Sequence, residues 1–223
     1  MAAADGGRSA AQTVVLVLLL GVFAVVVGIS GRDMLDLTRQ FTTRQDLETL
    51  RTLVLLYRTR HGALPGDDPR GVAGGEAAAE VTGVRGNGRW DGPALDLARP
   101  ERSEAVAAWA DLARAGLWQP DEDRTAAFAP VPHNRFGGLT LFADGLMGLG
   151  PALCLTSVPA ADALRLDARM DDGDPATGAL RAGLPDDAET AAGAAAVNRQ
   201  LRTGILPSDG RRAVVLCLDL AGG

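Results

Sequence analysis

The chain has 223 residues and a formal net charge of −6, with 22 basic and 28 acidic residues. All 22 basic residues are arginine and they form no basic patch, which argues against nucleic acid as a partner. Two histidines are too few for a histidine metal site or a general acid–base centre, so the sequence predicts a protein that is not an enzyme.

The first element is an apolar run from Val14 to Ile29 that contains no charged residue. With its flanking small residues it reaches the roughly 20 residues that a bilayer-spanning helix needs. The sequence therefore predicts a transmembrane segment at about residues 12–30.

A cleaved secretory signal is the alternative for this run. Its lead has no basic residue before Arg8, the run is longer than the usual signal core, and no small-residue cleavage site closes it. These features favour an uncleaved single-pass anchor. Arg8 and Arg32 flank the run on opposite sides, so the charges do not decide its orientation.

The helical pattern continues beyond the apolar run to His61. Leu47, Leu50, Val54 and Tyr57 follow the spacing of one helical stripe, and charged residues occupy the other positions. The second half of this helix is therefore expected to be amphipathic and to cover the rest of the chain. The predicted division is a long helix over residues 8–61 and a head over residues 62–223.

The head contains short helix and strand patterns separated by loops rich in glycine and proline. Pro100 or Ser103 is expected to open a helix that ends at Gly116, with Trp109 in the core. The other predicted elements are strands at 139–142, 152–156 and 214–220, a helix that begins at Pro159, and a weakly patterned helix at 186–201. This combination predicts an α+β fold in which the long helix packs on a small antiparallel sheet with short helices.

The two cysteines, Cys154 and Cys217, both lie in predicted strands. They are either small buried side chains or, if the head lies outside the cytoplasm, the two halves of a disulfide. By closing a loop in the unfolded chain, such a bond would raise the free energy of unfolding by about 4 kcal/mol.

An ordered set of motifs in this chain resembles the type IV pilin-like proteins, the prepilin and pseudopilin family. The long helix is followed by YRTRHGALPGDDP, then GNG, then a segment with tryptophan that ends in AGL, then a cysteine and an acidic DDG loop. The first group of matched residues is Tyr57, Leu64, Pro65, Gly66, Asp67, Gly86, Asn87, Gly88, Glu104, Trp109, Leu112, Ala115, Gly116 and Leu117. The second group is Cys154, Asp162, Ala163, Asp167, Asp171, Asp172, Gly173, Pro175 and Gly178.

The resemblance implies a structural subunit of a type IV pilus or of a type II secretion pseudopilus. Such a subunit is anchored in the bacterial inner membrane with its head in the periplasm, and it enters a filament through its N-terminal helix. Its implied partners are other pilin-like subunits, prepilin peptidase, the inner-membrane assembly platform and membrane lipid.

Family members are cut after a glycine, and a glutamate five residues beyond the cut aligns the incoming subunit. A cut after Gly7 would leave residues 1–7 as the leader and make Arg8 the first mature residue. Gln12 then stands in the place of the glutamate, and an amide cannot form the ion pair. This departure favours a minor subunit, which need not follow a neighbour into the filament.

The acidic exit of the third helix is the one cluster with metal-binding chemistry. It consists of Asp167, Asp171, Asp172 and Asp174, which gather at the negative end of a helix dipole. A hard cation such as Ca²⁺ would offset this repulsion. The alternatives are pairing with Arg165, Arg169 or Arg181, or hydrogen bonds from turn amides.

The loop motifs have two interpretations. The segment LPGDDP, from Leu64 to Pro69, is either a subunit contact or the turn that ends the long helix, and the GNG segment is expected to be a surface turn. Two classes of function follow for the whole chain. One is a filament or secretion-machine subunit, and the other is a membrane-anchored periplasmic binding protein, able to bind calcium, that stays monomeric.

Overall fold

The computed structural model describes residues 10–71, 83–95, 102–119, 131–185, 201–204, 206, 210 and 212–221. Within this part, the side chains of residues 24–33 are not described. The chain divides into two compact units, Met1–Phe41 and Thr42–Gly223. The boundary between the two units falls inside the first helix, so residues 42–61 belong to the same unit as the head.

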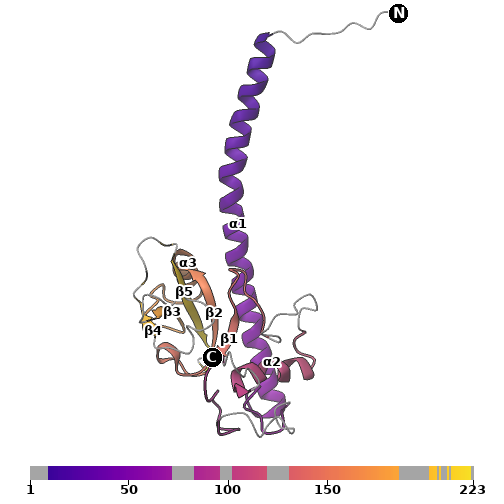
Figure 1. Ribbon diagram of the computed structural model, residues 1–223, viewed down its shortest axis with the longest axis vertical. Helices are drawn as coiled ribbons and strands as arrows, with labels where there is room; N and C mark the ends of the chain where they lie inside the picture. The colour runs from indigo at the N-terminus through magenta and orange to yellow at the C-terminus, as the bar shows by residue number, and fades with distance from the viewer. Residues whose placement is uncertain are drawn as a thin grey trace, which may run out of the picture. The chain divides into compact units, whose positions relative to one another are not determined.

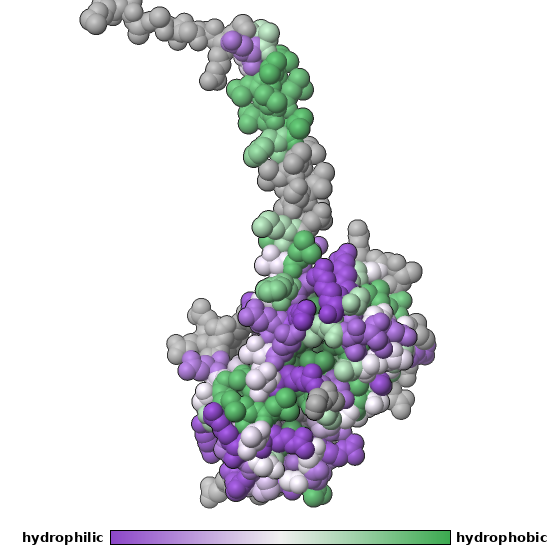
Figure 2. Space-filling model, turned by 180° about the vertical axis from the view of Figure 1, so that it is seen from behind, coloured by the Kyte–Doolittle hydropathy of each residue, from purple (hydrophilic) through white to green (hydrophobic). Residues whose placement is uncertain are grey.

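Helix α1 (Ala10–His61) has 52 residues, which confirms a long N-terminal helix. In the first unit the large apolar side chains that are described between residues 14 and 23 are exposed, and Figure 2 shows this hydrophobic surface on one face of the helix. The exposed residues of the run are Val14, Val15, Leu16, Val17, Leu18, Leu19, Leu20, Val22 and Phe23.

A search of the described residues finds no helix whose apolar stretch is long enough to cross a bilayer. The predicted span at residues 12–30 includes side chains of residues 24–30, which lie outside the described part. The membrane-spanning character of this half of α1 therefore stays a prediction.

The part of α1 that belongs to the second unit is amphipathic, as the sequence predicts. Leu47, Val54 and Tyr57 are buried, with exposed fractions of 1%, 1% and 3%, while Leu50 and Leu53 pack against the same core. Burial of one helical stripe explains why these residues belong to the head rather than to the first unit.

The head is built on a five-stranded antiparallel sheet in the order β1-β2-β5-β3-β4. Its strands are β1 (Thr140–Ala143), β2 (Ala152–Pro159), β3 (Leu180–Pro185), β4 (Leu201–Thr203) and β5 (Ala213–Asp219). Strands β1, β2 and β5 confirm the predicted strands within a few residues. The sequence pattern missed β3 and β4, because both lie in a segment rich in Ala, Gly and Asp without a run of apolar residues.

The predicted helix at residues 186–201 falls almost wholly outside the described residues, which end at Pro185 and resume at Leu201. Leu201 itself is the first residue of β4, so the predicted C-terminal end of that helix is wrong.

Helix α3 (Ala160–Met170) connects β2 to β3, and both strands are antiparallel to β5, which lies between them. The β2 and β3 strands are therefore parallel to each other, with α3 as the crossover that packs on β2, β3 and β5 (Figure 1). The turn from α3 into β3 carries the acidic exit.

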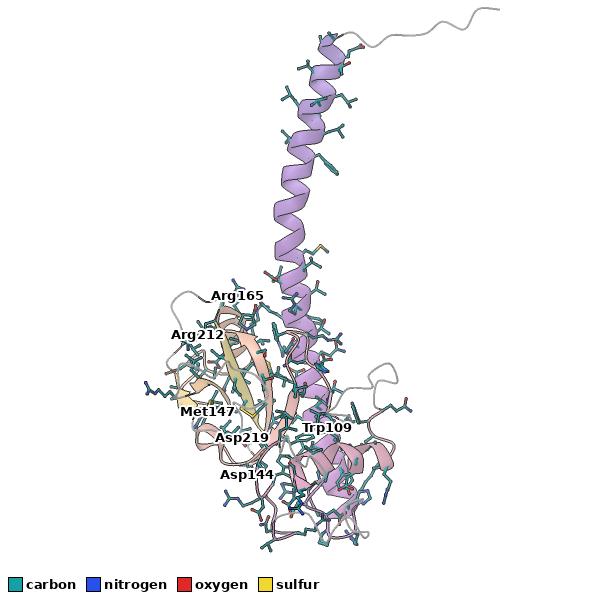
Figure 3. All side chains as sticks on the ribbon, viewed as in Figure 1. Trp109, Asp144, Met147, Arg165, Arg212 and Asp219 are labelled. Carbon is teal, nitrogen blue, oxygen red and sulfur yellow. A yellow bond between two sulfur atoms is a disulfide. The ribbon has the colours of Figure 1, made fainter. Side chains whose placement is uncertain are left out.

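Helix α2 (Glu104–Arg114) begins at the N-cap Ser103, whose side chain accepts a hydrogen bond from the Val106 amide. Its Trp109 is fully buried beside Phe142 of β1, with ring centroids 4.6 Å apart, which confirms the predicted core position. Figure 3 marks Trp109 in this part of the head. A short 3₁₀ turn lies at Leu146–Gly148 (η4).

Cys154 and Cys217 form a disulfide, which confirms that interpretation of the two cysteines. They are directly opposite each other in β2 and β5, with Cα atoms 4.1 Å apart, and both are fully buried. The bond joins residues 63 positions apart in the centre of the sheet.

Candidate functional site

The residues expected to direct processing lie at the beginning of the chain. Gly7 and Arg8 are outside the described residues, and Gln12 lies in the first turn of α1, where it is exposed.

The LPGD segment folds back onto the GNG turn. The carboxylate of Asp67, which is fully buried, accepts hydrogen bonds from the amides of Asn87 at 3.2 Å and Gly88 at 2.8 Å, and from the amide of Gly86. Burial raises the pKa of Asp67, while these three amides act to lower it. The GNG turn thus cradles an anion, and that anion is the chain's own carboxylate.

The same segment is held against α2. The Gly66 amide donates to Asp111 Oδ2 at 2.7 Å, and the Trp90 indole N–H donates to the Pro65 carbonyl at 2.7 Å. Gly66 has φ +82°, and a Cβ at this position would lie 2.1 Å from the Glu104 carbonyl oxygen. Only glycine fits this approach of the loop to the helix.

The end of α1 is joined to this loop through Asp68. The Tyr57 hydroxyl donates to Asp68 Oδ2 at 3.2 Å, and the Tyr57 ring stacks on His61 with centroids 4.2 Å apart. Burial and the nearby carboxylates of Asp111 and Asp68 raise the pKa of Tyr57, so the phenol stays protonated.

Glu104, at the start of α2, is a buried carboxyl with only one hydrogen-bonded oxygen. Its Oε2 accepts from the Asp91 amide at 2.8 Å, while Oε1 has no partner. Burial raises its pKa to about 7, with smaller contributions from Asp67 and Asp91, and Arg85 acts in the opposite direction.

Together these contacts support the turn interpretation of LPGDDP, because residues 64–68 are all buried inside the head. Sequence reasoning missed Trp90 and Asp111 as partners of the loop. Trp90 follows the GNG turn by two positions. Asp111 lies among the mostly apolar buried residues of α2, which is the signal that could have found it.

The acidic exit begins at the C-terminal end of α3. Asp171 is the C-cap residue, and its Oδ2 accepts from the Leu180 amide of β3 at 2.8 Å. Asp172 accepts from the Asp174 amide at 2.9 Å and from the Thr177 hydroxyl at 2.6 Å, and Asp174 accepts from the Ala176 amide at 2.9 Å. These three carboxylates follow the interpretation in which turn groups satisfy the acidic residues.

Asp167 does not fit the interpretation in which turn groups satisfy the acidic residues. The residue is fully buried, and neither of its carboxylate oxygens has a hydrogen-bond partner. Among the described residues it is the only carboxylate with both oxygens in this state. Leaving a buried polar group unpaired costs about 1–3 kcal/mol, and more for a charged group.

The surroundings of Asp167 add negative charge rather than compensate for it. Burial, followed by the charges of Asp172 and Asp171, raises the pKa of Asp167 to about 6, opposed by the nearby Gly173 amide, which lies outside hydrogen-bond geometry. The hydrogen bond from Thr177, followed by that from the Asp174 amide, lowers the pKa of Asp172, which stays ionised.

Two of the three predicted arginine partners, Arg165 and Arg181, form their hydrogen bonds with other groups. Arg165, labelled in Figure 3, pairs with Asp162 at 3.4 Å. Arg181 donates to the carbonyls of Gly178 at 3.1 Å and Met147 at 2.8 Å. Asp167, Asp171 and Asp172 each present an oxygen, and these three atoms lie within 4.8 Å of one another. Asp174 is not part of this group, and its side chain accepts from the Ala176 amide in the following turn.

A groove of about 260 Å³ lies between the second half of α1 and the loop before β1. Leu50, Leu53, Trp118, His133 and Leu155 are among its lining residues. At its edge Arg135 pairs with Asp46 at 3.0 Å, across the surface.

No protein family, no curated protein and no solved structure matches this chain.

Proposed function

We propose that this chain is a minor structural subunit of a type IV pilus or of a type II secretion pseudopilus. In this proposal it has a pilin-like fold and no enzymatic activity. It is anchored in the bacterial inner membrane, carries its head in the periplasm and assembles with other pilin-like subunits through α1.

The observation that carries the proposal is the contrast along α1. Its second half buries a stripe at Leu47, Val54 and Tyr57 within the head, whereas the apolar side chains from Val14 to Phe23 are exposed. Exposed apolar surface of this extent on a helix is suited to lipid or to the helices of other subunits.

The disulfide supports the proposed compartment. Disulfides persist in oxidising surroundings such as the bacterial periplasm and are rare in the cytosol. The Cys154–Cys217 bond is therefore consistent with a head on the periplasmic side of the membrane.

Replacement of Gly21 by leucine tests assembly. In this chain a Cβ at Gly21 would meet no atom within 4 Å, so Gly21→Leu adds bulk without disturbing the isolated subunit. We expect the variant to insert into the membrane normally and to co-purify less with other pilin-like subunits, since small residues let helices approach closely. Val22→Leu, at an exposed position that already carries a branched side chain, is the matched control and should assemble normally.

N-terminal sequencing of the mature protein is the companion measurement. Prepilin peptidase should cut after Gly7 and leave Arg8 as the first residue. A chain that retains Met1 or Ala2, together with normal assembly of Gly21→Leu, would contradict the filament proposal.

The second candidate is a membrane-anchored periplasmic binding protein that stays monomeric. The group of Asp167, Asp171 and Asp172 favours it, because a ligand site is more central to a binding protein than to a filament subunit. Cross-linking of the full chain in membranes distinguishes the two, since only the filament subunit should be captured with other pilin-like chains.

A further inference from the structure

The turn from α3 to β3 concentrates negative charge where a helix tolerates it least. Asp167 and Asp171 lie four residues apart in and just after the last turn of α3, and Asp172 follows. The C-terminal end of a helix carries a partial negative charge, so all three carboxylates are disfavoured there. Their arrangement needs a positive partner that the described side chains do not provide to Asp167.

We propose that Asp167, Asp171 and Asp172 bind a Ca²⁺ ion at this turn. Two independent observations support the site. The three carboxylates converge so that one oxygen from each lies within 4.8 Å of the others, and Asp167, fully buried, directs a carboxylate without any hydrogen bond into that group.

The spacing fits the radius of the ion. Calcium–oxygen distances are 2.3–2.6 Å, so two oxygens on opposite sides of one Ca²⁺ are separated by about 4.6–5.2 Å. Oxygens within 4.8 Å of one another can therefore reach one ion without movement of the backbone. Mg²⁺ has shorter bonds of about 2.0–2.1 Å and requires a near-ideal octahedron, which oxygens separated by up to 4.8 Å satisfy less readily.

The existing hydrogen bonds are compatible with coordination. Asp171 accepts from the Leu180 amide, and Asp172 from the Thr177 hydroxyl and the Asp174 amide, but a carboxylate has about four lone-pair positions and can accept a hydrogen bond and a cation together. These bonds orient the two exposed carboxylates, as the outer partners of metal ligands do. Asp171 and Asp172 are exposed, which leaves room for water to complete the six to eight ligands of Ca²⁺.

The close approach of Gly178 fixes the position of one ligand. Gly178 has φ +70°, and a Cβ there would lie 1.9 Å from Asp171 Oδ2. The backbone at Gly178, just before β3, therefore lies in close contact with the Asp171 carboxylate. Bound Ca²⁺ would link the end of α3 to the start of β3 through Asp171, whose Oδ2 already holds the Leu180 amide.

The experiment compares thermal unfolding of the full chain in detergent, with EGTA and with increasing free Ca²⁺. A ligand that binds only the native state stabilises it by mass action. At a free Ca²⁺ concentration about 100 times Kd, the Tm should rise by about 5–10 °C. Isothermal titration with CaCl₂ should show a single saturable site, and MgCl₂ at the same concentration should give a smaller shift.

Three variants make the test specific. Asp167→Asn removes the buried charge at almost constant volume, so it should unfold at the same or a higher Tm than the wild type in EGTA and should lose the calcium shift. Asp171→Asn should also lose most of the shift. Asp174→Asn removes the same charge from the same turn but keeps an oxygen for the Ala176 amide, and it should respond like the wild type.

Equal Tm values in EGTA and in saturating Ca²⁺ would overturn the proposal. So would a calcium shift that Asp167→Asn retains, or one that Asp174→Asn loses to the same extent, since both point to diffuse attraction by the acidic surface. A larger shift with Mg²⁺ than with Ca²⁺ would overturn the assignment of the ion. None of these outcomes bears on filament assembly, because the site does not depend on α1.

Discussion

Asp67 and Asp167 are both fully buried carboxylates beside glycine-rich turns, and their surroundings differ completely. Asp67 accepts hydrogen bonds from the three consecutive amides of residues 86–88. Asp167 accepts none, and the charges that act on it most strongly are those of two more carboxylates. The amides of the GNG turn are paired with a carboxylate of the same chain. The turn after α3 instead brings carboxylates together and contains no cationic side chain.

This difference separates structural motifs from ligand sites. A buried carboxylate that three amides satisfy is a brace between two loops, and it needs nothing from outside the chain. A buried carboxylate without partners is costly for the chain alone and is explained most simply by a positive ligand. Four tests probe this comparison, each with an expected effect on the free energy of unfolding.

Removal of the disulfide tests whether the effects of substitutions at Asp67 and Asp167 depend only on the immediate surroundings of each residue. Replacing Cys154 and Cys217 together by alanine opens a 63-residue loop and should lower the free energy of unfolding by about 4 kcal/mol. Urea unfolding followed by tryptophan fluorescence measures the loss, and non-reducing mass spectrometry confirms the bond in the wild type. If the comparison is local, the effects of Asp67→Asn and Asp167→Asn should be the same with and without the bond. Two free thiols in freshly isolated protein would contradict both the bond and the proposed compartment.

Glu104 is an intermediate case between Asp67 and Asp167 in its hydrogen bonding, because one of its oxygens has a partner and the other has none. Its pKa is about 7 in the folded protein and 4.5 when unperturbed, so between these values the folded state holds a proton that the unfolded state releases. Stability from this group is therefore fully present below pH 4.5 and is lost as the pH rises through 7, by about 3 kcal/mol in total.

Glu104→Gln isolates this contribution, since the amide stays neutral and can still accept from the Asp91 N–H. Urea unfolding from pH 4.5 to pH 8 should show the variant gaining stability relative to the wild type by about 3 kcal/mol. A constant difference across this range would show that the folded protein does not hold the proton.

Asp67→Asn and Asp167→Asn are the same chemical change at the two compared sites. At Asp67 the new NH₂ group replaces an acceptor and faces backbone donors, so the variant should lose about 2 kcal/mol. At Asp167, in EGTA, the same change should cost nothing or stabilise, because it removes a buried charge without breaking a hydrogen bond. Equal losses at both positions, measured by urea unfolding in EGTA, would remove the distinction between brace and ligand site.

The sequence predicts the elements with strong periodicity and misses those without it. The stripe at Leu47, Val54 and Tyr57, the cap at Ser103 and the disulfide strands all carry local signals that the structure confirms. Strands β3 and β4 carry none, because their stability comes from pairing with β5 and with each other rather than from their own apolar residues.

The sequence predicts that the aspartates of the candidate site cluster together, but it does not predict which of them is buried and which have hydrogen-bond partners. Four aspartates around one helix end are visible in the sequence, and three of them converge. Which one is buried without partners depends on how α3 packs on β2, β3 and β5, since that packing turns Asp167 inward. The role of Asp67 depends likewise on Gly86, Asn87 and Gly88, about 20 positions away in the chain, whose amides carry no side-chain signal.

The smallest expected effect concerns a carboxylate that water can satisfy. Asp46 pairs with Arg135 at 3.0 Å, but the two side chains are 46% and 57% exposed. Exposed ion pairs contribute about 0–1 kcal/mol, because water solvates each charge when the partner is removed. Arg135→Ala should therefore lower the free energy of unfolding by less than about 1 kcal/mol, and 1 M NaCl should reduce the effect further. A loss of about 2 kcal/mol or more, independent of salt, would mean that burial is not what makes a carboxylate depend on its partner, and the contrast between Asp67 and Asp167 would then need another cause.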